Sequence, residues 1–316
     1  MKKLTFKQYI LAFAAICCMP KCGYAQPGGP WKLDVWAGGG YLSGDMNYEI
    51  GGDLMSFGAQ SYANDPTSKL EFPFRVMTVT VNAAVTYSDL LEARISYSHN
   101  TDNPNKKMQD SDWDDGNDPS LMTVYSESDA GLKAYTVDGD IKFWLLRKYN
   151  EKQEVTAAFG PGVGYMYQNL DWDISNVDQW YPPYPDDPHY RFAGPVMTYD
   201  AEIYAPYVAL YGKAKLSWVQ LDGSFGWCFI STHERDNHLL RGKINTTDGS
   251  GKGIKANLNA KFPLHKGLYL TANINLFSFY ASGTQHQKFY GEEWYQINDR
   301  ARSTQLMYTL GLGYNF

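Results

Sequence analysis

The chain has 316 residues, and its 28 lysines and arginines against 34 aspartates and glutamates give a net charge of −6. Only 20% of the residues are charged, whereas 16% are aromatic and 25 are tyrosine. Binding to nucleic acid depends on basic residues that neutralise phosphates, and the sequence has no run of lysine and arginine. We therefore expect no nucleic-acid partner.

The N-terminus has the parts of an export signal. Two lysines precede an apolar segment at residues 10–19, and small residues suited to cleavage follow at residues 23–25. The sequence therefore predicts a signal peptide at residues 1–25 and one mature domain at residues 26–316. A lipoprotein modified at Cys17 is the less favoured alternative.

Apolar and polar side chains alternate in several segments, and this is the period of a β-strand. Between residues 254 and 262 the even positions are apolar, and the odd positions are lysine or asparagine. The same alternation occurs at residues 78–86, 268–276 and 306–316. These segments predict strands with one apolar and one polar face, in either an outer-membrane barrel or a soluble two-sheet sandwich.

Three features favour the barrel. Aromatic residues gather at the ends of the predicted strands, the chain carries an export signal, and its last strand ends in Phe316. Beyond the signal no stretch of about 18 apolar residues exists, which excludes helical membrane spans. Cys228 is the one cysteine of the mature chain, so we expect neither a disulfide framework nor a thiolate metal site.

Short and long connections alternate along the chain. We predict tight turns near residues 88–89, 148–152, 219–220 and 264–267, and long polar loops at residues 50–69, 100–122, 172–198, 232–251 and 282–303. This order predicts an all-β fold, a ten-stranded antiparallel up-and-down transmembrane β-barrel whose turns and termini face the periplasm and whose loops face outward. Barrels of about eight strands are filled by side chains and general porins need about sixteen, so a small-solute channel is disfavoured.

Two polar clusters fall in predicted outward loops on the same rim. The second loop carries Asp110 and Asp112, and the fourth carries Asp236 and His238. An i,i+2 spacing on an extended chain directs both side chains of a pair to one face, so the two pairs can meet across the barrel mouth. The alternative of a calcium loop beginning at Asp110 is weak, because an EF-hand needs a glutamate where Leu121 stands. We expect no bound metal.

The sequence resembles the omptin family of ten-stranded outer-membrane proteases. Besides the two polar pairs, the resemblance rests on short segments in the family's order: residues 40–44, Trp113, Asp118-Pro119, 144–146 and 205–207. The match extends over most of the mature chain. The resemblance implies a peptidase in the outer membrane of a Gram-negative bacterium, with its active site facing outside and peptides or proteins as substrates.

The resemblance also implies roles for the four residues. Asp110, Asp112, Asp236 and His238 are the expected catalytic residues, and they would hold a water that attacks the peptide carbonyl without a covalent intermediate. His238 would be the general base, and Asp236 would orient its imidazole. Two adjacent carboxylates are expected to share a proton that stabilises the oxyanion. His233 is the competing candidate for the base. No cofactor is expected.

The family favours cleavage near basic residues, whose side chains bind in an acidic pocket. Glu234 matches one pocket acid, whereas Tyr48 stands where the second is expected and Glu49 lies beside it. We therefore expect these three residues to bind substrate, with a weakened preference for basic side chains. Lipopolysaccharide activates the family and is the candidate activator here, although only Tyr165 fits the lipid-binding stretch. We expect a monomer that contacts outer-membrane lipid; a non-catalytic adhesin or structural barrel is the alternative function.

Overall fold

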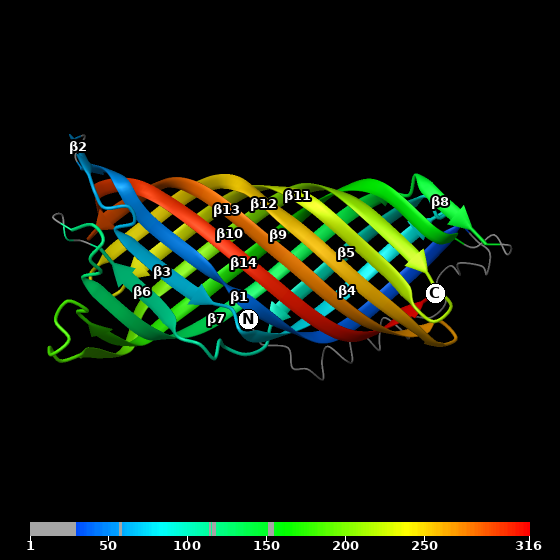
Figure 1. The fold of residues 1–316 in the computed structure, drawn as a ribbon, viewed down its shortest axis with the longest axis horizontal. Helices are drawn as coiled ribbons and strands as arrows, with labels where there is room; N and C mark the ends of the chain where they lie inside the picture. The colour runs from blue at the N-terminus through cyan, green and yellow to red at the C-terminus, as the bar shows by residue number, and fades with distance from the viewer. Residues whose placement is uncertain (1–29, 57–58, 114, 116–117, 151–154) are drawn as a thin grey trace.

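The computed structural model describes residues 30–56, 59–113, 115, 118–150 and 155–316, and the predicted signal peptide lies outside these residues. Ten long strands form the wall (Figure 1): β1 (Trp31–Ser56), β4 (Val76–Tyr87), β5 (Leu91–Asn100), β7 (Val124–Phe143), β9 (Val155–Trp180), β10 (Tyr190–Lys215), β11 (Gln220–His238), β12 (Lys243–His265), β13 (Leu268–Phe289) and β14 (Glu292–Asn315). Four short strands accompany them: β2 (Ala59–Tyr62), β3 (Ser68–Pro73), β6 (Met108–Asp112) and β8 (Leu146–Tyr149).

The strands close into a ring. Each of the ten pairs antiparallel with its neighbours in the chain, and β14 pairs with β1 over a long register that includes Gly40 opposite Thr309. The predicted ten-stranded up-and-down barrel is thereby confirmed. Among the described residues, no helix is long and apolar enough to cross a membrane.

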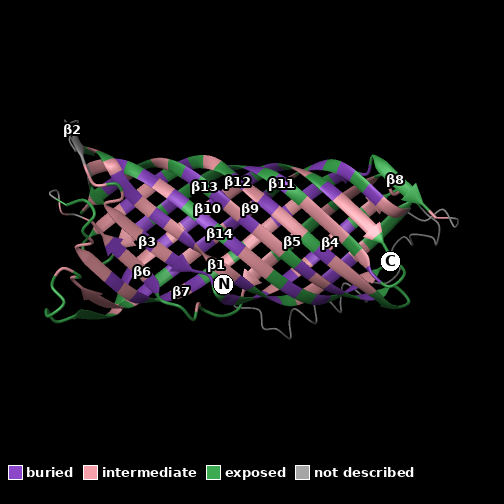
Figure 2. Ribbon diagram, in the orientation of Figure 1, coloured by how far each residue is buried: buried purple, intermediate pink, exposed green. Residues whose placement is uncertain are grey.

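The two faces of the wall differ in polarity, as the alternation predicts. Figure 2 shows buried and exposed residues alternating along the strands. On β12, for example, Leu258 is 53% exposed on the outer face, whereas its neighbour Asn259 is 7% exposed on the inner face. The outer face therefore presents an apolar belt and the inner face a polar lumen, which is the arrangement of a barrel solvated by lipid.

Aromatic residues border this belt at both ends. On one side Tyr97, Tyr135, Tyr167 and Tyr204 contact one another in series on β5, β7, β9 and β10, with ring centroids 6.5, 5.8 and 5.2 Å apart. At the turn end the ring pairs are Trp31 with Tyr87, Trp218 with Phe262, and Tyr314 with Phe316. Aromatic side chains prefer the membrane–water interface, so these two girdles mark the limits of the membrane-spanning segment.

The expected long loops are wrong in their extents. β9 continues to Trp180, β11 to His238 and β13 to Phe289, and each returns in a paired strand after a short connection. Spanning a membrane takes about 9–11 residues of a tilted strand, so the paired strands continue well beyond the tyrosine girdle. The predicted turns at residues 88–89 and 264–267 are confirmed, the third lies at residues 216–219, and part of the second falls outside the described residues.

Above the girdle, β3 and β6 complete the wall. β3 pairs with β1 and β6, and β6 pairs with β7, so these short strands continue the positions of β4 and β5. An aromatic cluster fills the lumen at this height: the ring centroid of Phe72 lies 4.5 Å from that of Tyr199 and 5.0 Å from that of Trp172. Because all three side chains are buried, they form a rigid floor beneath the rim.

Candidate active site

Asp236 and His238 lie on the inner face near the outer end of β11. Nε2 of His238 is 2.8 Å from Oδ2 of Asp236, and Nδ2 of Asn245 on β12 donates a hydrogen bond of 2.9 Å to the same oxygen. Asp236 is 2% exposed, whereas the His238 side chain is 18% exposed and reaches the barrel mouth. The carboxylate is thus held from two sides, and it orients an imidazole that solvent can reach.

Asp110 and Asp112 lie on β6, not in a loop. In the strand register Asp110 is opposite Leu70 on β3 and Ser126 on β7, so both neighbours fix its position. Burial, and after it the neighbouring Asp112 carboxylate, raise the pKa of Asp110 well above its ordinary value. These are the effects expected for two adjacent carboxyl groups that cannot both ionise easily.

The structure brings the two pairs into one site. The Asp236 carboxylate adds to the rise in the pKa of Asp110, whereas Arg241 and Lys243 oppose it. The carboxylates of Asp236, Asp112 and Asp110 favour the charged form of Lys243, and Asp236 has the largest effect of the three. Burial outweighs them and lowers the pKa of Lys243. Strands far apart in the sequence, β6 and β11, therefore face each other at the mouth.

Of the three residues expected to bind substrate, the structure places two together. Glu234 is 2% exposed and accepts a hydrogen bond of 2.5 Å from the hydroxyl of Tyr199. The Tyr48 ring lies 5.3 Å from the Tyr199 ring, on the inner face. Glu49 is on the opposite face of β1, where its Oε2 lies 3.8 Å from Nε of Arg300. No bulge turns the Glu49 side chain inward, so the structure does not bring Glu49 together with Glu234 and Tyr48.

Sequence reasoning missed Asp299, which belongs to this site. Asp299 on β14 is 2% exposed and accepts a hydrogen bond from the Thr247 hydroxyl. Burial, and then the Glu234 and Asp236 carboxylates, raise its pKa well above the ordinary value. The residue fell in a stretch interpreted as a loop; extending the alternation of β14 outward would have placed it on the inner face.

Two other histidines also have aspartate partners. Nδ1 of His233 is 2.7 Å from Oδ1 of Asp248, and Nδ1 of His189 is 2.9 Å from Oδ1 of Asp178. Both histidine side chains are about half exposed, at 55% and 46%. His233 alternates with Glu234 on β11 and so lies on the outer face, away from the paired aspartates.

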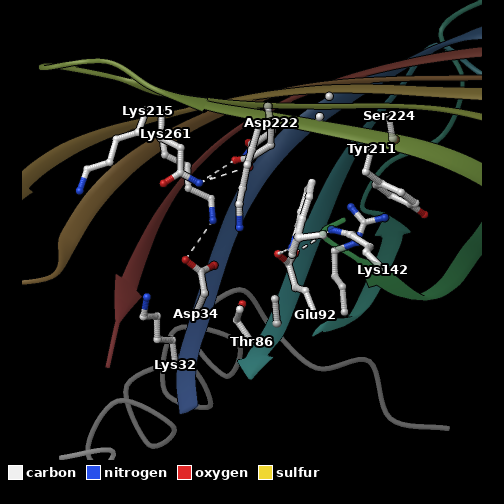
Figure 3. A pocket seen from close by; sticks show the side chains of 18 of the residues that line it. Lys32, Asp34, Thr86, Glu92, Lys142, Tyr211, Lys215, Asp222, Ser224 and Lys261 are labelled. Carbon is white, nitrogen blue, oxygen red and sulfur yellow. Dashed lines mark hydrogen bonds and ion pairs between the residues drawn. The ribbon is translucent and has the colours of Figure 1, made fainter. Parts of the chain in front are cut away.

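The opposite end of the lumen holds a polar cavity of about 340 Å³. Figure 3 shows Lys142 and Glu92 joined by an ion pair of 2.7 Å and Lys261 and Asp34 joined by one of 3.0 Å. Farther along, Arg94 bridges from β5 to Asp140 on β7, with Nε 2.9 Å from Oδ2.

Together with the aromatic floor, these ion pairs bridge the lumen, which argues against a wide solute channel. In the part of the chain that the structure describes, no group of three or more His, Cys, Asp and Glu residues has the geometry to hold a metal ion.

A closed ten-stranded ring with an apolar belt between aromatic girdles defines the chain as an outer-membrane β-barrel. The Omptin family model matches residues 60–316, and the chain belongs to this family. Its fold resembles that of the outer membrane protease OmpT from Escherichia coli, with a TM-score of 0.68 and 18% identity over 91% of this chain and 97% of that one.

Two more distant folds are OprG from Pseudomonas aeruginosa and the translocator domain of the autotransporter NalP from Neisseria meningitidis. The first has a TM-score of 0.40 at 9% identity, covering 90% of this chain and 95% of that one; the second has 0.36 at 11%, covering 98% and 95%. No curated protein matches the sequence. Family and fold together place the chain in the outer membrane and support a protease.

Proposed function

We propose that this barrel is an endopeptidase of the bacterial surface, in which water activated by the Asp236–His238 couple attacks a peptide bond opposite the Asp110–Asp112 couple. The observation that carries the proposal is the contact of 2.8 Å between Nε2 of His238 and Oδ2 of Asp236 in a site that also contains Asp110. The site lies beyond the tyrosine girdle, at the end of the barrel away from the tight turns. This position supports an active site that faces outside.

The proposed chemistry needs one general base. With Nε2 directed at Asp236, Nδ1 of His238 takes a proton from water as the water oxygen forms a bond to the substrate carbonyl carbon. Asp236 stabilises the resulting imidazolium. As the tetrahedral intermediate collapses, the C–N bond breaks and the imidazolium returns its proton to the leaving amine. The reaction as written needs neither a metal nor a covalent intermediate with the protein.

Asp110 and Asp112 would hold the water and the oxyanion. A carboxyl group that keeps its proton at neutral pH can donate a hydrogen bond to a developing negative charge. Burial and the Asp112 carboxylate raise the pKa of Asp110, which favours the protonated form that donates such a hydrogen bond. Arg241 and Lys243, which lie within electrostatic reach, add positive charge to the same site.

Substrate choice, lipid and assembly belong to the same proposal. Glu234 on the inner wall favours cleavage near basic residues, and several acidic residues in the protruding strands attract cationic peptides. Tyr165, 50% exposed next to the girdle, contacts outer-membrane lipid, and lipopolysaccharide is the activator to test. The barrel acts as a monomer.

The test is hydrolysis of quenched fluorescent peptides by the refolded barrel in detergent, with and without lipopolysaccharide. We expect His238→Ala and Asp236→Ala to reduce kcat by about 10²–10⁴-fold, the range typical of lost general-base catalysis. His233→Ala, a histidine of the same strand paired with Asp248 on the outer face, is the matched control and should retain activity. A folded barrel that cleaves no peptide would instead be an adhesin or structural protein.

A further inference from the structure

The lumen cavity at the turn end of the barrel is lined by more basic than acidic side chains. Its volume is about 340 Å³, and small-molecule sites typically occupy about 300–1,000 Å³. Among the described residues that line it, four are acidic and six are basic: Lys32, Arg94, Lys142, Lys213, Lys215 and Lys261. These charges take no part in the peptidase chemistry proposed for the other end of the lumen.

The barrel wall already supplies a donor for each of the four acids. The pairs are Asp34 with Lys261, Asp89 with Lys32, Glu92 with Lys142 and Asp222 with Gln220, with N···O distances of 3.0, 2.7, 2.7 and 3.1 Å. Figure 3 shows the Asp34 pair on one side of the cavity and the Glu92 pair on the other. The acids are thus satisfied by the wall itself, and the excess charge of the cavity is positive.

Lys213 on β10 forms no ion pair with a carboxylate of the described residues. Its Nζ lies 4.2 Å from the ring centroid of Trp144, which is 2% exposed and donates a hydrogen bond of 3.2 Å to Glu92. In the strand register Lys213 is opposite Asp222, but the Asp222 carboxylate accepts hydrogen bonds from Gln220 instead. An enclosed charge is costly without a partner, so an anion in the cavity is the counter-ion that Lys213 lacks.

The cavity reaches the turns at one end and the charged middle of the barrel at the other. Asp89 lies in the turn between β4 and β5, and Lys215 and Gln220 flank the turn between β10 and β11. At the inner end lies Arg94, whose Nε is 2.9 Å from Oδ2 of Asp140. An anion would therefore enter from the turn side, which the proposed orientation of the barrel places in the periplasm.

The surroundings suit a phosphate group. Lysine binds phosphate as a point charge, and a charged cavity within a low-dielectric wall concentrates its potential. The wall here faces lipid, since Leu210 on β10 is 52% exposed on the outer face. Asn259 also lines the cavity, and its Oδ1 accepts a hydrogen bond of 2.6 Å from Thr271. The amide N–H groups of Asn259 are therefore the part that can bind an anion.

We propose that this cavity binds a small soluble anion that carries phosphate groups, with Lys213 as its direct counter-ion and the neighbouring lysines as the source of the attracting potential. The site is separate from the proposed peptidase site, and its occupancy does not depend on that function. The bound anion also stabilises the barrel, because it binds the folded chain and not the unfolded one.

The test is calorimetry of pyrophosphate with the refolded barrel, in a detergent without phosphate groups so that lipid phosphate does not contribute. We expect saturable binding and a rise in Tm, and we expect Lys213→Gln to weaken the affinity about tenfold, the effect of losing one charged hydrogen bond. Lys266→Gln, which removes an exposed lysine from a turn at the same end, is the matched control and should leave the affinity unchanged. An equal loss in both variants, or no saturable binding by the unaltered barrel, would overturn the proposal.

Two further measurements test the proposal even if Lys213→Gln fails to fold. Asp89→Asn removes the acid that is paired with Lys32, so we expect pyrophosphate to bind about threefold more tightly. Unchanged or weaker binding in this variant would contradict a cavity whose positive charge attracts the ligand. Citrate, a carboxylate anion of similar charge, should bind more weakly than pyrophosphate, and tighter binding of citrate would overturn the assignment to phosphate.

Discussion

Asp236 and His238 leave the same strand two residues apart, and Nε2 of His238 lies 2.8 Å from Oδ2 of Asp236. Successive odd or even positions of a strand share one face, so the backbone of β11 itself presents the pair. The ladder with β10 and β12 continues to His238, which makes the strand end rigid. A couple that would be mobile on a loop is thereby held in position by backbone hydrogen bonds.

The first prediction concerns the pH dependence of the reaction. Because burial and Asp112 raise the pKa of Asp110, the pair keeps a shared proton into a higher pH range than an isolated carboxyl. We expect kcat/KM to fall as the pH rises through this pKa, since the hydrogen bond to the oxyanion is then lost. In Asp110→Asn, activity should be about 10²-fold lower and this alkaline decline absent, because an amide cannot ionise. Rate profiles from pH 5 to 10 measure both; an unchanged decline would assign it to another group.

The second prediction concerns Asn245 as a positioning residue. Its amide donates to the Asp236 oxygen that also contacts His238, so Asn245→Ala releases one side of the carboxylate. We expect kcat to fall about 10–100-fold with little change in KM, because small displacements of catalytic groups affect the chemical step most. Asn257→Ala, on the same strand but bonded to Asn275, is the control. An equal loss in both variants would point to general damage to β12.

The third prediction concerns stability and Asp299. Its pKa is raised in the folded barrel, so the folded chain keeps a proton that the unfolded chain releases. The associated stability is present below the ordinary pKa of an unfolded aspartate and is lost as the pH rises through the raised value. Asparagine resembles the protonated form, so Asp299→Asn should raise Tm by about 3 °C at pH 8 and hardly at pH 4. The exposed control Asp186→Asn should change neither; an equal gain at both pH values would exclude ionisation as the cause.

The fourth prediction concerns the packing of Gly164 on β9. A Cβ added there would lie 2.3 Å from Cζ of Tyr207, a ring held by a hydrogen bond of 2.9 Å from its hydroxyl to Asp138. We expect Gly164→Ala to destabilise the barrel by about 1–3 kcal/mol, as overpacking does. Gly223→Ala is the control, because the nearest atom to its Cβ is 3.7 Å away. Denaturant unfolding of the two variants in detergent measures the difference, and equal stabilities would contradict the contact.

Much of this protein was readable from the sequence. The alternation of β12, in which Leu258 faces outward and Asn259 inward, predicted the membrane-facing wall, since the side-chain period of a strand is a local property. The spacing of Asp110 with Asp112 and of Asp236 with His238 predicted that each pair shares a face. The omptin resemblance then predicted the family to which the chain belongs.

The tertiary structure decided the rest. The strands continue beyond the membrane because each finds a partner there, which the composition does not reveal. Residues 232–251 have the polar composition of a loop, yet apart from the turn at 239–242 they form paired strands. Whether Tyr48 or Glu49 faces the site depended on the register of β1 with β14, since a shift of one residue exchanges the faces. The approach of Asp299 to Glu234 depended on closure of the barrel, which sets distances between strands far apart in the chain.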